Sequence, residues 1–168
     1  EITFWRLLVA SVAVGVAMRV RGEVWRISRQ DGKRFLVYGL VTALHFGFYV
    51  AALYFTTIAH ALAIVYTAPV FVALFSALLL HEPLSRRQWA GILVAVAGVA
   101  ILAGFQPDFT RRMMFGDLLA LGSAITFGLY SVAGRSQRQR YSLFTYAATV
   151  YSAAALWMLV PAAVTFTP

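Results

Sequence analysis

His45 and Tyr49 are the residues whose types and spacing most clearly offer chemistry. They lie four positions apart inside residues 35–80, a stretch without a single Asp, Glu, Lys or Arg. A helix places both side chains on one face, where an imidazole and a phenol can hydrogen-bond a polar solute. The imidazole can also carry a proton near neutral pH. The sequence therefore predicts a polar face inside an otherwise apolar segment.

Similar narrow, uncharged polar faces recur in three further segments, including one formed by Thr145, Thr149 and Ser152. Lipid offers no hydrogen-bond partners, so a polar face on a membrane helix points toward other helices or a cavity. We therefore expect these faces to line a shared pocket. Its expected lining is Thr42, His45, Tyr49, Tyr66, Thr67, Ser123, Thr126 and Tyr130. Two alternatives remain open: each Ser or Thr bonds only its own helix backbone, and His45 is a packing residue.

Several kinds of chemistry are excluded by what the sequence lacks. There is no cysteine, and all six carboxylates fall in loops or near the ends of the apolar segments. The sequence also lacks the metal-protease, serine-hydrolase and phosphate-loop motifs. We therefore expect no metal site, no cofactor and no enzymatic activity. An aromatic pocket without charge suits neutral, zwitterionic or aromatic solutes.

The elements that must position these residues are long apolar helices. Hydrophobic residues make up 61% of the chain and charged residues 12%, whereas soluble domains average about 25% charged. A bilayer core of about 30 Å needs about 20 apolar residues per helix. Six segments satisfy this: 2–20, 34–56, 60–80, 87–105, 115–134 and 142–165. The expected fold class is an all-α, multi-pass membrane bundle.

Basic residues indicate how the bundle is oriented. Loops 19–34, 81–87 and 135–141 hold eleven Lys or Arg residues, whereas 56–60 and 106–114 hold two. Basic loops stay on the cytoplasmic side, so these three loops are expected there. This topology, rather than nucleic-acid binding, explains the net charge of +8. It leaves both chain ends outside, so we expect a further helix before residue 1.

Two local features concern helix shape and packing. Pro69 lies inside the segment 60–80 and should kink it, because proline removes a backbone hydrogen bond. Gly91, Ala95 and Gly98 share one face of the segment 87–105. Small residues at this spacing let helices approach closely, so this face predicts helix packing or a homodimer contact.

The order of several motifs resembles EamA-like members of the drug/metabolite transporter superfamily. Residues 61–71 (ALAIVYTAPVF) are similar to the family's fourth helix, and they precede 81–91 (HEPLSRRQWAG) and 98–102 (GVAIL). His81 stands where the family usually has glycine. Arg6 with Ala10 resembles the start of the second helix, and 116–120 (GDLLA) with Tyr130 resembles the opening of the sixth. The resemblance covers essentially the whole chain.

The resemblance implies a ten-helix carrier built from two inverted repeats of five helices. Residues 1–105 would be the first repeat without its first helix, and residues 106–168 would be the start of the second repeat. Helix one and helices eight to ten of the implied fold are then expected to lie outside this sequence. The solute would bind near the midplane and cross by alternating access. The implied function is export of amino acids, other metabolites or drugs across the bacterial inner membrane. A membrane scaffold or sensor with the same fold is the alternative.

Overall fold

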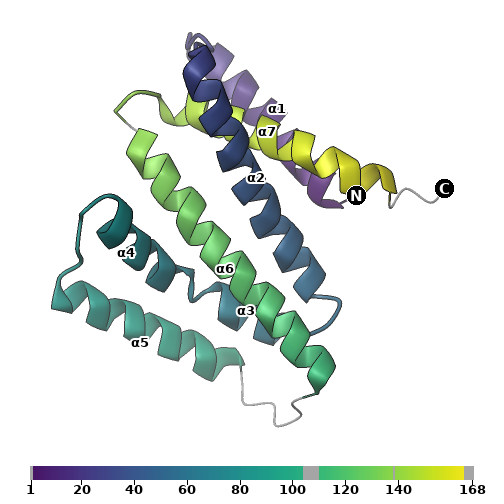
Figure 1. Cartoon of the computed structure of the whole chain (residues 1–168), viewed down its shortest axis with the longest axis vertical. Helices are drawn as coiled ribbons and strands as arrows, with labels where there is room; N and C mark the ends of the chain where they lie inside the picture. The colour runs from purple at the N-terminus through teal and green to yellow at the C-terminus, as the bar shows by residue number, and fades with distance from the viewer. Residues whose placement is uncertain (1, 104–109, 138, 165–168) are drawn as a thin grey trace. The chain divides into compact units, whose positions relative to one another are not determined.

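The computed structural model describes residues 2–103, 110–137 and 139–164, and these residues form helices and connections with no strand (Figure 1). Seven helices occur in these ranges: α1 (Ile2–Val20), α2 (Arg29–Ala52), α3 (Ile58–Val65), α4 (Ala68–Leu79), α5 (Arg86–Ala103), α6 (Arg111–Gln137) and α7 (Leu143–Val164). The expected all-α, multi-pass class is confirmed.

Among the described residues, five helical stretches are long and apolar enough to cross a membrane. They are α1, α2, α6, α7 and the consecutive pair α3 and α4, taken together as Ile58–Leu79. The crossing expected at 87–105 corresponds to α5, which is not among the five. Its first turn contains Arg86 and Arg87, and residues 104–105 lie outside the described ranges. The end of the expected crossing therefore lies outside the described residues, and a crossing at α5 stays a prediction.

The segment expected to be one helix kinked at Pro69 is two helices instead. α3 ends at Val65, and α4 begins at Ala68 with Pro69 in its first turn. Proline has no N–H to donate to the carbonyl four residues earlier, and its ring disfavours a helical conformation just before it. Thr67 lies between α3 and α4. Its hydroxyl and its N–H both donate to Ile64 O, at 2.6 and 3.0 Å.

The chain forms two compact units, the first of which contains the described residues of 1–43 and 133–168. In this unit α1 packs along α7, as the purple and yellow helices show in Figure 1. Ser11 and Ser152 share a hydrogen bond of 2.6 Å between these two helices. Phe35, Tyr146 and Val150 form a buried apolar cluster.

α2 also approaches α7 closely within the first unit, at Gly39. A Cβ atom added to this buried glycine would lie 2.8 Å from the carbonyl carbon of Ala153 and 2.9 Å from the backbone nitrogen of Ala154. No other residue fits this contact without moving backbone atoms. Glycine at position 39 thus sets the separation between α2 and α7.

The second unit contains residues 44–132. Ala52, Ala61 and Ala120 form its small buried cluster, and partly buried side chains such as Tyr49 and Leu119 pack against them. α3 also contacts α5. The alanines bring α2, α3 and α6 close together, because their side chains occupy little space between the backbones.

The small-residue face of α5 has an open surround within the described part of the chain. A Cβ atom added to Gly91 or Gly98 would meet no atom within 4 Å in the described part of the chain, and Ala95 is exposed. The spacing of small residues identifies a face that can pack closely, but it does not show which helix packs against that face. A contact between this face and a second copy or a further helix therefore stays a prediction.

Candidate functional site

His45 on α2 and Ser123 on α6 form a buried polar pair in the second unit. His45 is 8% exposed and Ser123 is fully buried. His45 Nδ1 lies 2.9 Å from both the carbonyl oxygen and the hydroxyl oxygen of Ser123. The Ser123 hydroxyl donates to the His45 carbonyl at 3.0 Å. These bonds join the two helices at one level.

The geometry of this pair assigns the tautomer of His45. A carbonyl oxygen can only accept, so the 2.9 Å contact between His45 Nδ1 and the carbonyl oxygen of Ser123 is a hydrogen bond only when Nδ1 carries the proton. We therefore assign the proton of neutral His45 to Nδ1, which makes Nε2 an acceptor.

Aromatic rings surround this histidine. The ring centroids of Phe46 and Phe127 lie 4.8 and 5.2 Å from that of His45, and the Tyr130 ring stacks on it at 6.3 Å. Phe127 and Tyr130 also meet edge to face at 5.3 Å. The arrangement offers an acceptor nitrogen and a tyrosine inside an otherwise apolar wall.

Four of the eight expected pocket residues thus come together: His45, Ser123, Thr126 and Tyr130. Thr126 joins the group because its hydroxyl donates to the carbonyls of Gly122 and Ser123, at 2.8 and 3.0 Å. We call these four residues the His45 cluster. Periodicity alone identified its members, although it could not show that α2 and α6 are neighbours.

The other four expected residues have different surroundings. Thr42 is fully buried in the first unit and donates to Tyr38 O. Tyr49 packs against the alanine cluster, and Tyr66 is 56% exposed. Thr67 bonds the backbone of Ile64. The place of these four residues in a pocket with the His45 cluster stays a prediction.

Several hydroxyls adopt the alternative that the sequence left open, in which they bond their own helix backbone. Thr42, Thr126, Thr149 and Ser152 each donate to the carbonyl four residues earlier. Such bonds satisfy a hydroxyl without any solute or water. The polar faces on these helices are therefore compatible with a dry interior as well as with a wet one.

Two carboxylate clusters were not anticipated from the sequence. In the second unit, Asp117 accepts a hydrogen bond from Thr56 at 2.8 Å and lies 3.6 Å from His60. His60 belongs to the first turn of α3. Asp117 and Thr56 are 61 positions apart, and no spacing rule connects such distant residues.

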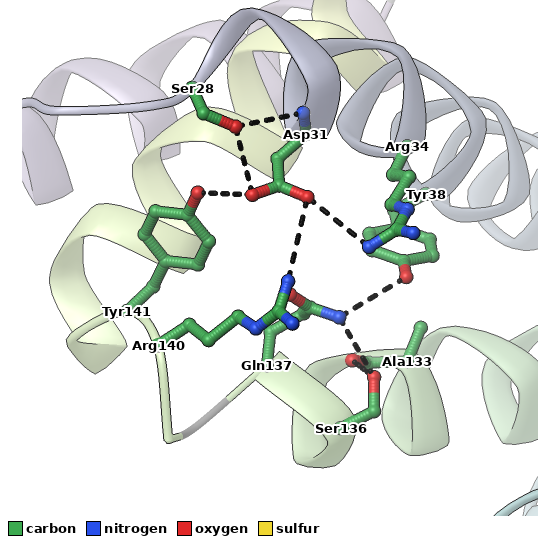
Figure 2. Close-up of polar contacts among 9 residues, drawn as sticks. All are labelled: Ser28, Asp31, Arg34, Tyr38, Ala133, Ser136, Gln137, Arg140 and Tyr141. Carbon is green, nitrogen blue, oxygen red and sulfur yellow. Dashed lines mark hydrogen bonds and ion pairs between the residues drawn. The ribbon is translucent and has the colours of Figure 1, made fainter.

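The second carboxylate cluster surrounds Asp31 in the first unit, as Figure 2 shows. Asp31 accepts hydrogen bonds from Tyr141 at 2.8 Å and Ser28 at 3.0 Å. The guanidinium groups of Arg34 and Arg140 lie 3.2 and 3.9 Å from the same carboxylate. These contacts connect the start of α2 to the connection between α6 and α7, so they have a structural role at this end of the unit.

Comparison with known proteins gives consistent similarities. The model of the EamA-like transporter family matches residues 1–104. The chain is 32% identical over 133 residues to the aromatic amino acid exporter YddG of Ancylobacter novellus, covering 76% of this chain and 43% of that protein. It is 30% identical over 144 residues to the pseudopaline exporter CntI of Pseudomonas aeruginosa, covering 86% and 49% respectively.

Two further matches extend over almost the whole chain. An uncharacterized transporter of Archaeoglobus fulgidus is 26% identical over 167 residues, covering 95% of this chain and 55% of the relative. One solved crystal structure, 28% identical, superimposes with a TM-score of 0.79 over 99% of this chain and 58% of that structure's chain. This chain spans about half the length of the curated relatives it matches.

Proposed function

Because this chain belongs to the EamA-like transporter family, we propose that the whole protein exports a small solute across the bacterial cytoplasmic membrane. Two of its relatives are named as exporters, one of aromatic amino acids and one of pseudopaline. The proposed solute is neutral, zwitterionic or aromatic, with amino acids as the leading class. It crosses by alternating access between two inverted repeats, and residues 1–105 and 106–168 belong to different repeats.

The observation that carries this proposal is the His45 cluster. Its rings supply apolar contact area, and His45 Nε2 supplies an acceptor for an ammonium or hydroxyl group of the solute. The cluster contains no carboxylate, lysine or arginine, so a solute with net charge would find no counter-charge there. Pockets of this composition bind mainly through apolar contact and orient the solute with few polar groups.

A membrane scaffold or sensor that does not transport is the second candidate. The hydroxyls that bond their own backbone support it, because they leave the polar faces satisfied without a solute. The transporter and the scaffold or sensor predict different rates of solute export from cells. Bacterial cells that overproduce the whole protein should accumulate less of a labelled aromatic or other zwitterionic amino acid than cells with the empty vector. Equal accumulation of every solute tested, with the protein present in the membrane, would favour the scaffold.

The proposed orientation places loops 19–34, 81–87 and 135–141 in the cytoplasm, because most Lys and Arg residues of the loops lie in them. In the whole protein, a cysteine replacing Ser28 should react only with membrane-permeant reagents in intact cells. A cysteine replacing Thr110 should react with impermeant reagents added outside. Reaction of both cysteines with the impermeant reagent would contradict this orientation.

A further inference from the structure

One exposed face at the start of α2 carries basic side chains first and apolar side chains after them. Arg29 and Lys33 are one helical turn apart and both are exposed. Leu36 and Val37 follow on the same face, and they are 47% and 57% exposed. The opposite face of the helix is buried at Asp31 and Phe35. Two cations thus stand directly above exposed apolar side chains.

The positive charge of this face is not neutralised by nearby acids. The carboxylates of segment 19–34 are Glu23 and Asp31. Glu23 accepts a hydrogen bond from Ser142, and Asp31 is held by Tyr141, Ser28, Arg34 and Arg140. No ion pair joins Arg29 or Lys33 to a carboxylate in the part of the chain that the structure describes. Both cations are therefore available to an external anion.

Trp25, four residues before Arg29, is a residue type typical of the membrane surface. It is 48% exposed and lies in the irregular segment between α1 and α2, next to exposed Val24. The chain turns into this segment at Gly22, whose φ is 71°. Tryptophan side chains collect at the level of lipid headgroups, because the indole combines an apolar body with one N–H donor.

We propose that Arg29 and Lys33 bind the headgroup phosphate of an anionic phospholipid, whose acyl chains lie along Leu36 and Val37. Arginine and lysine donate charge-assisted hydrogen bonds to phosphate. A net anionic lipid is favoured over a zwitterionic one, because the site holds two cations with no ion-pair partner among the described residues. A lipid is favoured over free phosphate, because only a lipid also covers the apolar side chains below. The proposal does not depend on which solute the protein transports.

The test measures lipid binding by the whole purified protein with native mass spectrometry. Phosphatidylglycerol and phosphatidylcholine with identical acyl chains are titrated separately. Each basic side chain near an anionic surface contributes about a fivefold factor in affinity, so the double variant Arg29→Gln/Lys33→Gln should bind phosphatidylglycerol roughly 30-fold more weakly. Binding of phosphatidylcholine should change little. Each single variant should show about a fivefold loss, so the test does not require the double variant to fold.

Arg86→Gln/Arg87→Gln is the matched control, because it removes the same charge at the exposed start of α5. This control should keep the phosphatidylglycerol affinity of the unmodified protein, because it leaves Arg29 and Lys33 in place. An equal loss in the control would show a general effect of charge and overturn the specific site. Full affinity of the single variants would also overturn it, as would complete displacement of phosphatidylglycerol by inorganic phosphate.

Discussion

Tyr130→Ala is expected to lower solute export by the whole protein by about tenfold or more, while the protein still inserts and folds. Tyr130 stacks on His45 and contacts Phe127 edge to face, so its ring forms one wall of the proposed site. A loss of about 1.4 kcal/mol in solute binding corresponds to a tenfold change. Removing an aromatic wall commonly costs at least that much. Initial export rates, normalised to protein in the membrane, measure the effect.

Two variants make this result specific. Tyr130→Phe keeps the ring and removes the hydroxyl, so it should keep most activity if ring contact dominates. Tyr54→Ala removes a tyrosine that is 71% exposed in the turn after α2, and it should leave export unchanged. Wild-type export by Tyr130→Ala would contradict the assignment of the His45 cluster to the solute site.

Gly39→Leu is expected to give the largest loss of stability among single substitutions in the first unit. A side chain at this position meets the backbone of Ala153 and Ala154 at less than 3 Å, and backbone atoms of a packed helix cannot move independently. Overpacking of this kind typically costs about 1–3 kcal/mol and sometimes more. Thermal unfolding of the whole protein in detergent should therefore shift to a clearly lower temperature.

Gly15→Leu provides the control for this experiment. Gly15 lies in α1, and a Cβ atom there would meet nothing within 4 Å among the described residues. Both substitutions add the same side chain to a helix, so helix propensity changes equally. Equal melting temperatures for the two variants would show that α2 and α7 do not approach each other as closely as the structure indicates.

Hydropathy predicted most of the fold because the bilayer imposes strict demands on length and polarity. α1 has the expected bounds, and the ends of α2, α6 and α7 fall within a few residues of those expected. The disturbance near Pro69 was predictable because proline always removes one donor. Its form, an end at Val65 and a new start at Ala68, depends on the local bonds that Thr67 makes.

Partners across the bundle could not be predicted from periodicity. A helical face shows that His45 and Tyr49 point in similar directions, but Ser123 is 78 positions from His45 and was placed beside it only by the fold. The same limit applies to Tyr141, 110 positions from Asp31. Gly39 and Gly98 show that a sequence pattern also does not reveal which glycine makes a close contact between helices. The small-residue pattern indicated the face of Gly98, whereas a close contact between helices among the described residues is at Gly39.

Solute counterflow into liposomes that contain the whole purified protein shows whether the protein transports a solute. The liposomes are loaded with a panel of unlabelled amino acids, and the uptake of each labelled counterpart is followed. We expect uptake of at least one aromatic or other zwitterionic amino acid above that of protein-free liposomes, and we expect Tyr130→Ala to reduce it. Folded protein that gives no uptake of any solute in the panel would contradict the proposed transport and favour a scaffold or sensor.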